Sequence, residues 1–551
     1  MTLESQLTQM ESNASMFEDV LRQDCPDSIA LFKDGAAISF EESSTTYPLS
    51  DSQRSAFPNL ISQDHAVVLN AVSTAEKPKG LKVAVLFSGG PAAGGHNVVL
   101  GLSDYLGTEN TLLGVRRGPK GLLAGDFFEV TSDALKSVRN LGGFNFLMSD
   151  RTKIKTEEQF SRVETVVKTH GLNAIVVVGG DDSNTNAAML AERLKPLGCH
   201  VIGVPKTIDG DLQVGKQVPI SFGFDTATKI YAELVGNICQ DTASSVKYWH
   251  FVKLMGRSAS HVTLEVALQT KPAIALISEE VAAKKQSLSE IVQSIADQVK
   301  GRASQGVYHG VVLVPEGIIE FIPEFKQLIS ALNEVLGHHP DWTQLPFTEV
   351  MAQLSSALDD ASYRLLNSLP QDIAQMLLAD RDSHGNLQVS LIQTEQLLSR
   401  MVADRLSKSD PEIPFKALTH FFGYEGRCGA PTRFDAFYTY NLGQVAGALI
   451  GDGRTGYMAA VTSFDQGGVA LGIPLPGLIV AEQRHGKTEL VIDKALVELN
   501  SPAFKYFESR RSEWAKTDLF SSPGPRQYFG DTAKQIPISV ALNQGYASLL
   551  Y

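Results

Sequence analysis

Short apolar runs alternate with longer segments of helical periodicity along most of this chain. Runs of five to eight apolar residues, bounded by glycine or polar turns, are typical of strands that are buried on both faces of a parallel sheet. The runs of this kind are LKVAVLF (81–87), NAIVVVGG (173–180), HVIGVPK (200–206), YWHFVKLM (248–255), AIALISEE (273–280), VYHGVVLVPEG (307–317) and YMAAVTSF (457–464). Helical stretches such as TATKIYAELVGNI (226–238) lie between them. The pattern predicts an α/β protein with a parallel sheet covered on both faces.

Changes in this pattern divide the chain into segments. The N-terminal part is polar, has helical character and ends at the linker EKPKG, and a later stretch is rich in Leu, Gln, Ser, Asp and Ala at helical spacing. We interpret the first as an extension and the second as a helical insertion. The predicted segments are an N-terminal extension (1–78), a first α/β domain (79–245), a second α/β domain (246–323), the helical insertion (324–415), a return segment that completes the α/β domains (416–490) and a C-terminal extension (491–551).

Composition and charge exclude several classes of protein. The 551 residues include 48 Lys and Arg against 61 Asp and Glu, a formal net charge of −13, whereas nonspecific nucleic-acid binding favours a basic surface. No run of about 18 apolar residues is present, so no membrane span is expected. The four cysteines have no CxxC spacing, and the acidic start lacks the pattern of a secretory signal. We therefore expect a cytoplasmic protein.

Glycine-rich turns follow two of the predicted strands. SGGPAAGGHN (88–97) precedes a helix, and its glycines favour a phosphate cradle over an ordinary turn, because they allow close backbone approach to an anion at a helix N-terminus. GGDDSNTNA (179–187) repeats this arrangement and adds the carboxylates of Asp181 and Asp182. These side chains could bind Mg²⁺ beside phosphates or simply cap the following helix, and the sequence alone leaves both readings open.

Further strand ends carry charged residues. PKTIDGD (205–211) places Lys206, which could hold a phosphate, near carboxylates that could accept a proton from a hydroxyl. Taken alone, this motif favours a solvated loop with Asp turns over a catalytic site. The remaining strand-end motifs are MGR (255–257), PEG (315–317) and YEGR (424–427). Each is weak alone, but open α/β sheets build their sites at the carboxyl ends of strands.

The ordered set SGG, GGDDS, PKTIDGD, MGR, PEG and YEGR resembles the phosphofructokinase family over residues 81–460. The chain length, N-terminal extension and helical insertion are similar to those of its long-chain, pyrophosphate-dependent branch. The resemblance implies two doubly wound, Rossmann-like α/β domains with the active site in the cleft between them. The first domain would bind the donor and the second the sugar phosphate. The implied reaction is reversible transfer of a phosphoryl group from pyrophosphate to the 1-hydroxyl of fructose 6-phosphate, with Mg²⁺.

The resemblance also implies roles for individual donor-site residues. Gly89 matches the glycine whose backbone contacts the donor phosphates, Asp181 the magnesium-associated aspartate and Asp209 the catalytic base. ATP-dependent members have GGDGS and PGTIDND where this chain has Asp182 and Lys206. The carboxylate of Asp182 would fill the space that a nucleotide needs, and Lys206 would supply a cation to the leaving phosphate. Pyrophosphate binding and catalysis are therefore both expected to depend on Asp182 and Lys206.

Residues at the sugar site follow from the same resemblance. The matching positions are Thr207, Ile208 and Asp209 in the catalytic loop, Met255, Gly256 and Arg257 in the strip that holds the sugar and the transferred phosphoryl, Glu316 for the sugar, and Tyr424 and Arg427 for the 6-phosphate. Lys247 and Tyr248 match positions that reach the site of a neighbouring subunit, so a homo-oligomer is expected, with a dimer favoured. Arg151 and Lys153 in SDRTK are expected near the donor.

Two other readings remain. One keeps the fold and changes the chemistry, either to an ATP-dependent phosphofructokinase or to a more distant kinase with GGD loops that acts on NAD or diacylglycerol. The other is a catalytically silent regulatory subunit, which should show lost functional residues. Gly89, Asp181, Asp209, Arg257 and Arg427 are all present, which favours an active enzyme.

Overall fold

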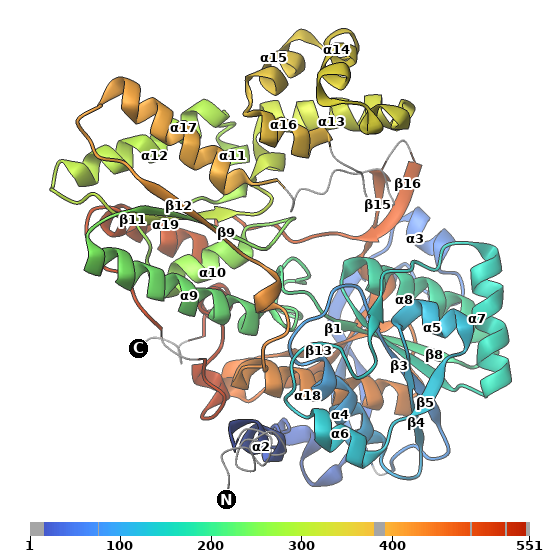
Figure 1. Cartoon of the computed structure of the whole chain (residues 1–551). Helices are drawn as coiled ribbons and strands as arrows, with labels where there is room; N and C mark the ends of the chain where they lie inside the picture. Colours follow the sequence, from blue (N-terminus) through green and yellow to red (C-terminus); the bar gives the residue numbers. More distant parts are fainter. Residues whose placement is uncertain (1–15, 75, 379–391, 485–486, 524–525, 547–551) are drawn as a thin grey trace, which may run out of the picture. The chain divides into compact units, whose positions relative to one another are not determined.

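The computed structural model describes residues 16–74, 76–378, 392–484, 487–523 and 526–546, which form two compact units (Figure 1). Unit 1 contains the described residues up to Ala227, the segment Glu425–Ala495 and the described residues from Arg526 onward. Unit 2 contains Thr228–Tyr424 and Leu496–Pro525, within the described ranges. Unit 1 thus combines the N-terminal extension, most of the first α/β domain and most of the return segment.

A ten-stranded sheet forms the centre of unit 1 and confirms the predicted α/β class. In spatial order its strands are β1 (Ala37–Pro48), β2 (His65–Thr74), β14 (Val469–Pro474), β13 (Tyr457–Thr462), β8 (His200–Pro205), β7 (Ala174–Gly179), β3 (Lys82–Ser88), β4 (Thr111–Val115) and β5 (Phe127–Glu129), with β6 (Ser149–Asp150) beside β3. The strands from β13 to β4 are parallel, and the flanking pairs are antiparallel. Of these parallel strands, β3, β7, β8 and β13 were predicted from continuous apolar runs, whereas β4 was not.

Helices cover both faces of this sheet (Figure 1). On one side lie α4 (Gly95–Leu106), α6 (Ser132–Val138) and α18 (Arg433–Gly451), and on the other α5 (Gly118–Ala124), α7 (Glu157–His170) and α8 (Asp181–Leu194). Ala84 and Leu86 of β3 share a buried cluster with Leu190 of α8 and Val163 of α7. Because both faces are buried, these strands need apolar residues at every position. The remaining helices of unit 1 are α2 (Met16–Gln23), α3 (Asp51–Ala56) and α20 (Ile538–Gln544).

The N-terminal extension differs from its helical prediction. Strands β1 and β2 pair antiparallel, and β2 continues onto β14, so the extension enlarges the central sheet. After its first four residues β1 alternates between exposed and half-buried positions, which identifies an edge strand with one face toward solvent. Its polar sequence EESSTT is compatible with an edge position. Because this sequence contains no apolar run, the strand was not predicted.

Unit 2 is built on a four-stranded parallel sheet. The order is β10 (Ile274–Ala275), β11 (Gly310–Pro315), β9 (Trp249–Leu254) and β12 (Ala417–Phe422). The predicted strand 273–280 is mostly wrong, because only two residues pair and helix α11 (Ser278–Ala283) follows. The other helices close to this sheet are α9 (Phe224–Ser245), α10 (His261–Thr270), α12 (Leu288–Ala303), α17 (Thr394–Ser409) and α19 (Pro502–Trp514).

The insertion predicted over residues 324–415 is helical in its described residues. It contains α13 (Pro323–His338), α14 (Phe347–Ala357), α15 (Asp360–Ser368), α16 (Gln371–Leu378) and α17. Leu332 of α13 and Leu366 of α15 belong to the same buried cluster as Trp249 and Phe251 of β9. The insertion therefore shares one core with the sheet of unit 2.

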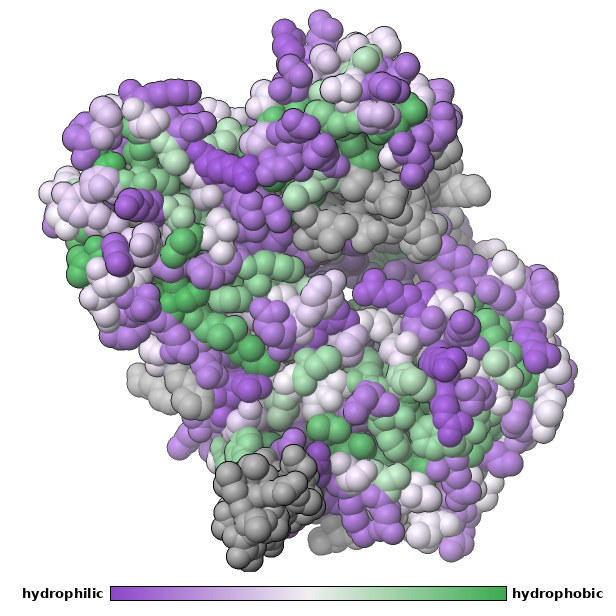
Figure 2. Space-filling model, in the orientation of Figure 1, coloured by the Kyte–Doolittle hydropathy of each residue, from purple (hydrophilic) through white to green (hydrophobic). Residues whose placement is uncertain are grey.

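Polar residues cover much of the surface that Figure 2 shows, and hydrophobic residues gather there only in smaller areas. Of the helices in the described part of the chain, none has the length and apolar character needed to cross a membrane.

Candidate active site

Three neighbouring parallel strands of unit 1 bring the first predicted site residues to one edge of the sheet. Gly179 at the end of β7 pairs with Pro205 at the end of β8. Lys206 follows its strand directly, and Asp181 follows one residue after its strand ends. Gly89 follows β3 and has φ +82°, a left-handed conformation that glycine adopts without strain. Its N–H donates to Asp150 O at 3.0 Å. The glycine loop is therefore attached to the end of β6.

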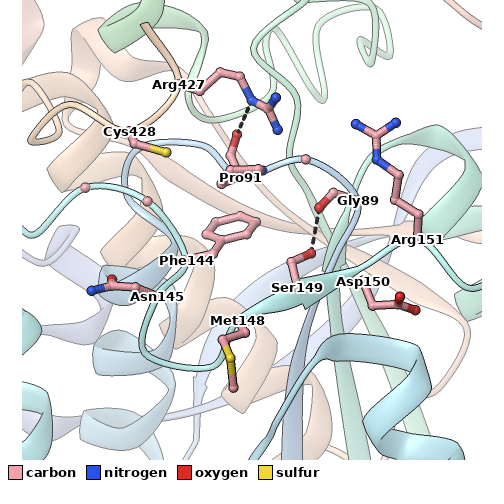
Figure 3. A pocket seen from close by; sticks show the side chains of 13 residues that line it. Gly89, Pro91, Phe144, Asn145, Met148, Ser149, Asp150, Arg151, Arg427 and Cys428 are labelled. Atoms are coloured by element: carbon pink, nitrogen blue, oxygen red, sulfur yellow. Dashed lines mark hydrogen bonds between the residues drawn. The ribbon is translucent and has the colours of Figure 1, made fainter. Parts of the chain in front are cut away.

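A pocket of about 540 Å³ opens over this loop (Figure 3). Its lining residues are Gly89, Gly90, Pro91, Gly142, Gly143, Phe144, Asn145, Met148, Ser149, Asp150, Arg151, Arg427 and Cys428. Figure 3 shows both arginine side chains on the same side of the glycine loop, and Arg427 Nε donates to Pro91 O at 3.4 Å. A Cβ at position 90 would clash with the Arg427 guanidinium and lie 3.7 Å from Arg151 Nη2. Two guanidinium groups thus border the loop, a geometry suited to phosphate oxygens.

Lys206 is buried beneath this pocket, with only 5% of the residue exposed. A Cβ added at Gly89 would lie 3.3 Å from its Nζ, and the ring of Phe144 has its centroid 6.0 Å from the same atom. Burial, and after it the charge of Arg427, lowers the pKa of Lys206 to about 8, against the opposing effect of Asp209 and Asp181. Burial of this ammonium therefore costs desolvation free energy, which the attraction of a bound anion would offset.

The two acidic residues at the start of α8 have different surroundings. Asp181 is largely buried, and its pKa is raised by burial although Lys494 opposes the shift. The Asp182 carboxylate is exposed and accepts a hydrogen bond from Lys153 Nζ at 3.0 Å. Asn184 Nδ2 donates to Gly179 O and Gly180 O, which fixes the turn between β7 and α8. The first turn of α8 therefore presents one half-buried and one solvent-facing carboxylate.

The loop after β8 is held by its own polar groups. Asp209 N donates to Thr207 Oγ1 at 3.1 Å, and Ser221 Oγ donates to Thr207 O at 3.0 Å. Ile208 is buried. Asp211 is also buried, and its Oδ2 lies 3.7 Å from Lys494 Nζ.

Sequence reasoning missed Lys494. Its Nζ also lies 3.8 Å from Asp181 Oδ2, so one ammonium faces two carboxylates. The residue lies beyond the span of the motifs, and no local pattern around it indicates a site.

In unit 2 the predicted sugar residues converge at the carboxyl ends of β9 and β11. Gly256 N donates to Glu316 Oε2 at 2.8 Å, and Glu316 is buried. Gly256 has φ +138°, which permits the sharp turn from Met255 to the exposed Arg257. A Cβ on Gly317 would clash with the Arg257 carbonyl, so the two turns pack closely.

Tyr424 follows β12 at the same edge of this sheet and is 66% exposed. Met255 N donates to Phe422 O at 3.0 Å, which ties the end of β12 to that of β9. Lys247 and Tyr248 lie instead before β9, at the opposite edge, about 20 Å away along the extended strand. Their ammonium and ring are 5.2 Å apart. The structure thus separates these two residues from the other predicted sugar ligands of unit 2.

A second feature that the sequence did not predict is a buried polar cluster in unit 1, at the N-terminal ends of α9 and α18. Asp435 accepts hydrogen bonds from Gly223 N, Thr226 N and Thr226 Oγ1, and Thr432 Oγ1 donates to Asp225 Oδ2 at 2.6 Å. Burial and the nearby Asp225 charge raise the pKa of Asp435 to about 7. The cluster ties the beginning of α9 to that of α18.

Within the described part of the chain, no group of three or more His, Cys, Asp or Glu side chains is arranged to hold a metal ion.

Comparison with known proteins gives concordant matches. Residues 82–450 match the family model described as Phosphofructokinase. A Treponema pallidum (strain Nichols) protein named pyrophosphate–fructose 6-phosphate 1-phosphotransferase is 47% identical over 505 residues, 88% of each chain. Subunit beta 2 of the enzyme with that name from Arabidopsis thaliana is 47% identical over 494 residues, 86% of this chain and 84% of that protein. The crystal structure of Pichia pastoris phosphofructokinase in the T-state aligns with a TM-score of 0.50 and 17% identity, over 73% of this chain and 36% of that one, and bears on the fold alone.

Proposed function

Because the chain belongs to the phosphofructokinase family, we propose that it transfers a phosphoryl group from pyrophosphate to the 1-hydroxyl of fructose 6-phosphate. The products are fructose 1,6-bisphosphate and phosphate, and the reaction is reversible. The relatives that carry this activity in their names are 47% identical over most of their length. The reading as a silent subunit has no support, since the predicted functional residues are present.

The observation that carries the choice of donor is the buried ammonium of Lys206 beneath the glycine loop. Its depressed pKa means that the site keeps a cation in a poorly solvated position. A pyrophosphate seated on the loop would place its leaving phosphate near this charge, with Arg151 and Arg427 at the rim of the pocket. Such a fixed cation stabilises charge that develops on the leaving group during transfer.

Asp182 supports the same choice by exclusion. Its carboxylate stands in the first turn of α8, where the ATP-dependent motif has glycine, and it is paired with Lys153. A nucleotide that extended over this turn would meet both the volume and the negative charge of the side chain, and like charges in a partly dry site are costly.

Asp209 acts as the general base. Its carboxylate takes the proton of the attacking 1-hydroxyl, and Thr207 and Ile208 position the loop that carries it. Gly89 contributes its backbone to the donor phosphates. The pairing of Asp209 N with Thr207 Oγ1 limits the movement of this loop before substrate binds.

Mg²⁺ fits the donor site as an ion held mainly by the donor itself. Mg²⁺ usually takes one or two carboxylates together with substrate phosphates and water, rather than a complete protein cage. Asp181 and Asp211 converge on a single cationic group, so their oxygens lie where a divalent ion could be shared. When bound, the metal would neutralise the phosphate oxygens and orient them for transfer. Asp181 is the residue that would hold it, with Asp211 beside it.

The residues proposed for the sugar phosphate are those that match the family's motifs. Met255, Gly256 and Arg257 form the strip for the sugar and the transferred phosphoryl, and the buried carboxylate of Glu316 is placed to accept hydrogen bonds from sugar hydroxyls. Tyr424 and Arg427 would bind the 6-phosphate.

We further propose a homo-oligomer, with a dimer favoured, in which Lys247 and Tyr248 serve a neighbouring subunit. Their location at the sheet edge opposite Met255 agrees with that role. We place the enzyme in the cytoplasm, because its four cysteines are unpaired and a reducing compartment keeps them so.

The test is a coupled assay of the purified chain with fructose 6-phosphate and either pyrophosphate or ATP. The wild-type chain should use pyrophosphate. Asp182→Gly should give measurable turnover with ATP and a lower kcat/KM with pyrophosphate, because it removes bulk and charge and releases Lys153 from its partner. Asp133→Asn, which alters an exposed carboxylate paired with Lys136, is the matched control and should leave the ratio unchanged. A wild-type preference for ATP, or an unchanged donor ratio in Asp182→Gly, would sink the proposal.

A further inference from the structure

Lys494 lies at the proposed donor site, in a segment of the chain that the family model does not cover. It follows β16 (Lys487–Ile492), which pairs antiparallel with β15 (Ile479–Arg484), whereas the family match ends at residue 450. Two backbone hydrogen bonds fix the segment on either side of the lysine. Ile492 N donates to Thr185 Oγ1 of α8 at 2.9 Å, and Ala495 N donates to Asp211 O at 2.7 Å. The lysine is therefore positioned by both strand-end motifs.

The ammonium lies between two carboxylates and is bonded closely to neither. Its distances are 3.8 Å to Asp181 Oδ2 and 3.7 Å to Asp211 Oδ2, whereas a charge-assisted hydrogen bond measures about 2.7–2.9 Å. The Asp211 side chain is 6% exposed and the Lys494 side chain 29% exposed. Two carboxylates, one of them almost fully buried, would repel each other strongly without a shared cation.

We propose that Lys494 is the resident counter-cation of Asp181 and Asp211, and that it competes with a divalent cation for these two carboxylates. The inference rests on the proposed function, in which this pair faces the metal–pyrophosphate complex. In the free enzyme the ammonium keeps the carboxylates together and their repulsion low. The same charge weakens binding of a bare divalent ion, so the metal enters most favourably when pyrophosphate brings its own negative charge. Lys494 is thus a positioning residue that favours the metal–donor complex over the metal alone.

The competition can be measured on the free enzyme without any turnover. Mn²⁺ is titrated into the full chain, without pyrophosphate or sugar phosphate, and free Mn²⁺ is followed by electron paramagnetic resonance. Lys494→Gln removes the charge and should tighten Mn²⁺ binding by about 10-fold, which corresponds to about 1.4 kcal/mol. Lys494→Arg keeps the charge and should bind Mn²⁺ within about twofold of the wild-type chain. Lys136→Gln, at an exposed lysine paired with Asp133, is the matched control and should bind like the wild type.

A second pair of variants identifies the site being titrated. Asp181→Asn should abolish the tightened binding when combined with Lys494→Gln, because the metal then loses one of the two carboxylates. Circular dichroism spectra of all variants establish that they are folded. Equal or weaker Mn²⁺ affinity in folded Lys494→Gln would overturn the proposal, and so would tightened binding in Lys494→Arg. Absence of pyrophosphate-dependent activity in the wild-type chain would instead refute the proposed function, and the titration separates the two results.

Discussion

Replacing Lys206 by methionine should stabilise the folded chain and remove its activity. Methionine keeps the length of the buried stem and its contact with the Phe144 region, but carries no charge. The pKa of Lys206 is lowered from 10.5 to about 8, mainly by burial. Each pKa unit corresponds to about 1.4 kcal/mol, so holding this ammonium at pH 7 costs roughly 3 kcal/mol of unfolding free energy.

The stability difference between Lys206→Met and the wild type should depend on pH. Because the folded-state pKa lies below the unfolded value, the unfolded chain binds the proton more tightly. The penalty is therefore complete below about pH 8 and disappears as the pH rises toward 10.5. The free energy of unfolding of Lys206→Met should exceed that of the wild type by roughly 3 kcal/mol at pH 7 and by only about 1.4 kcal/mol at pH 9.5.

Urea unfolding at these two pH values measures the difference, and a coupled assay measures activity. The kcat with pyrophosphate should fall by about 100-fold or more, because we propose that the cation acts on the leaving phosphate in the transition state. Lys136→Met, at an exposed lysine, is the control and should change neither quantity appreciably. A Lys206→Met chain that unfolds more easily than the wild type at pH 7 would refute the reasoning, as would a stability difference that does not change with pH.

Two further substitutions test other parts of the molecule. Asp209→Ala should lower kcat by about 10²–10⁴-fold in the coupled assay with little change in fold, because a positioned base accepts the hydroxyl proton, and near-wild-type turnover would remove Asp209 from that role. The pKa of Asp435 is raised to about 7, so its contribution to stability is complete below its unfolded pKa of about 4 and is lost as the pH rises through 7. The stability advantage of the wild type over Asp435→Asn in urea unfolding should therefore shrink from pH 5 to pH 7, and a constant difference would contradict the assignment.

The central strands could be predicted because burial on both faces of the sheet requires a continuous run of apolar residues. Residues such as Val176 and Val177 of β7 face opposite sides of the sheet and are both buried, which demands an uninterrupted apolar run. The same rule failed for β1, an edge strand whose outer half alternates between exposed and half-buried positions. It also extended β10 too far, since the apolar residue Ile277 is buried just before a helix begins.

The donor-site residues at strand ends could be anticipated for a topological reason. Asp181 and Lys206 follow adjacent parallel strands, so sequence order alone brings them to one edge of the sheet. Lys494 could not be anticipated in this way, because its position depends on a hairpin that returns the chain to α8 after about 300 residues of intervening sequence. Asp435 could not be anticipated for a different reason. Its local sequence is typical of the first turn of a helix, and its buried partners lie more than 200 residues away in the sequence.

The pairing of charges at the donor site explains how an acidic chain can accept a polyanion. The net charge is −13, but solvent screens charges beyond about 8 Å at physiological salt, so the local balance governs binding. Lys494 offsets Asp181 and Asp211, and Lys153 offsets Asp182. The lysines thereby reduce the repulsion between phosphate and the carboxylates for which we propose roles in donor choice and metal binding. Replacing either Lys153 or Lys494 by an uncharged residue should consequently raise the KM for pyrophosphate more than the KM for the sugar phosphate, since the uncompensated negative charge would face the donor.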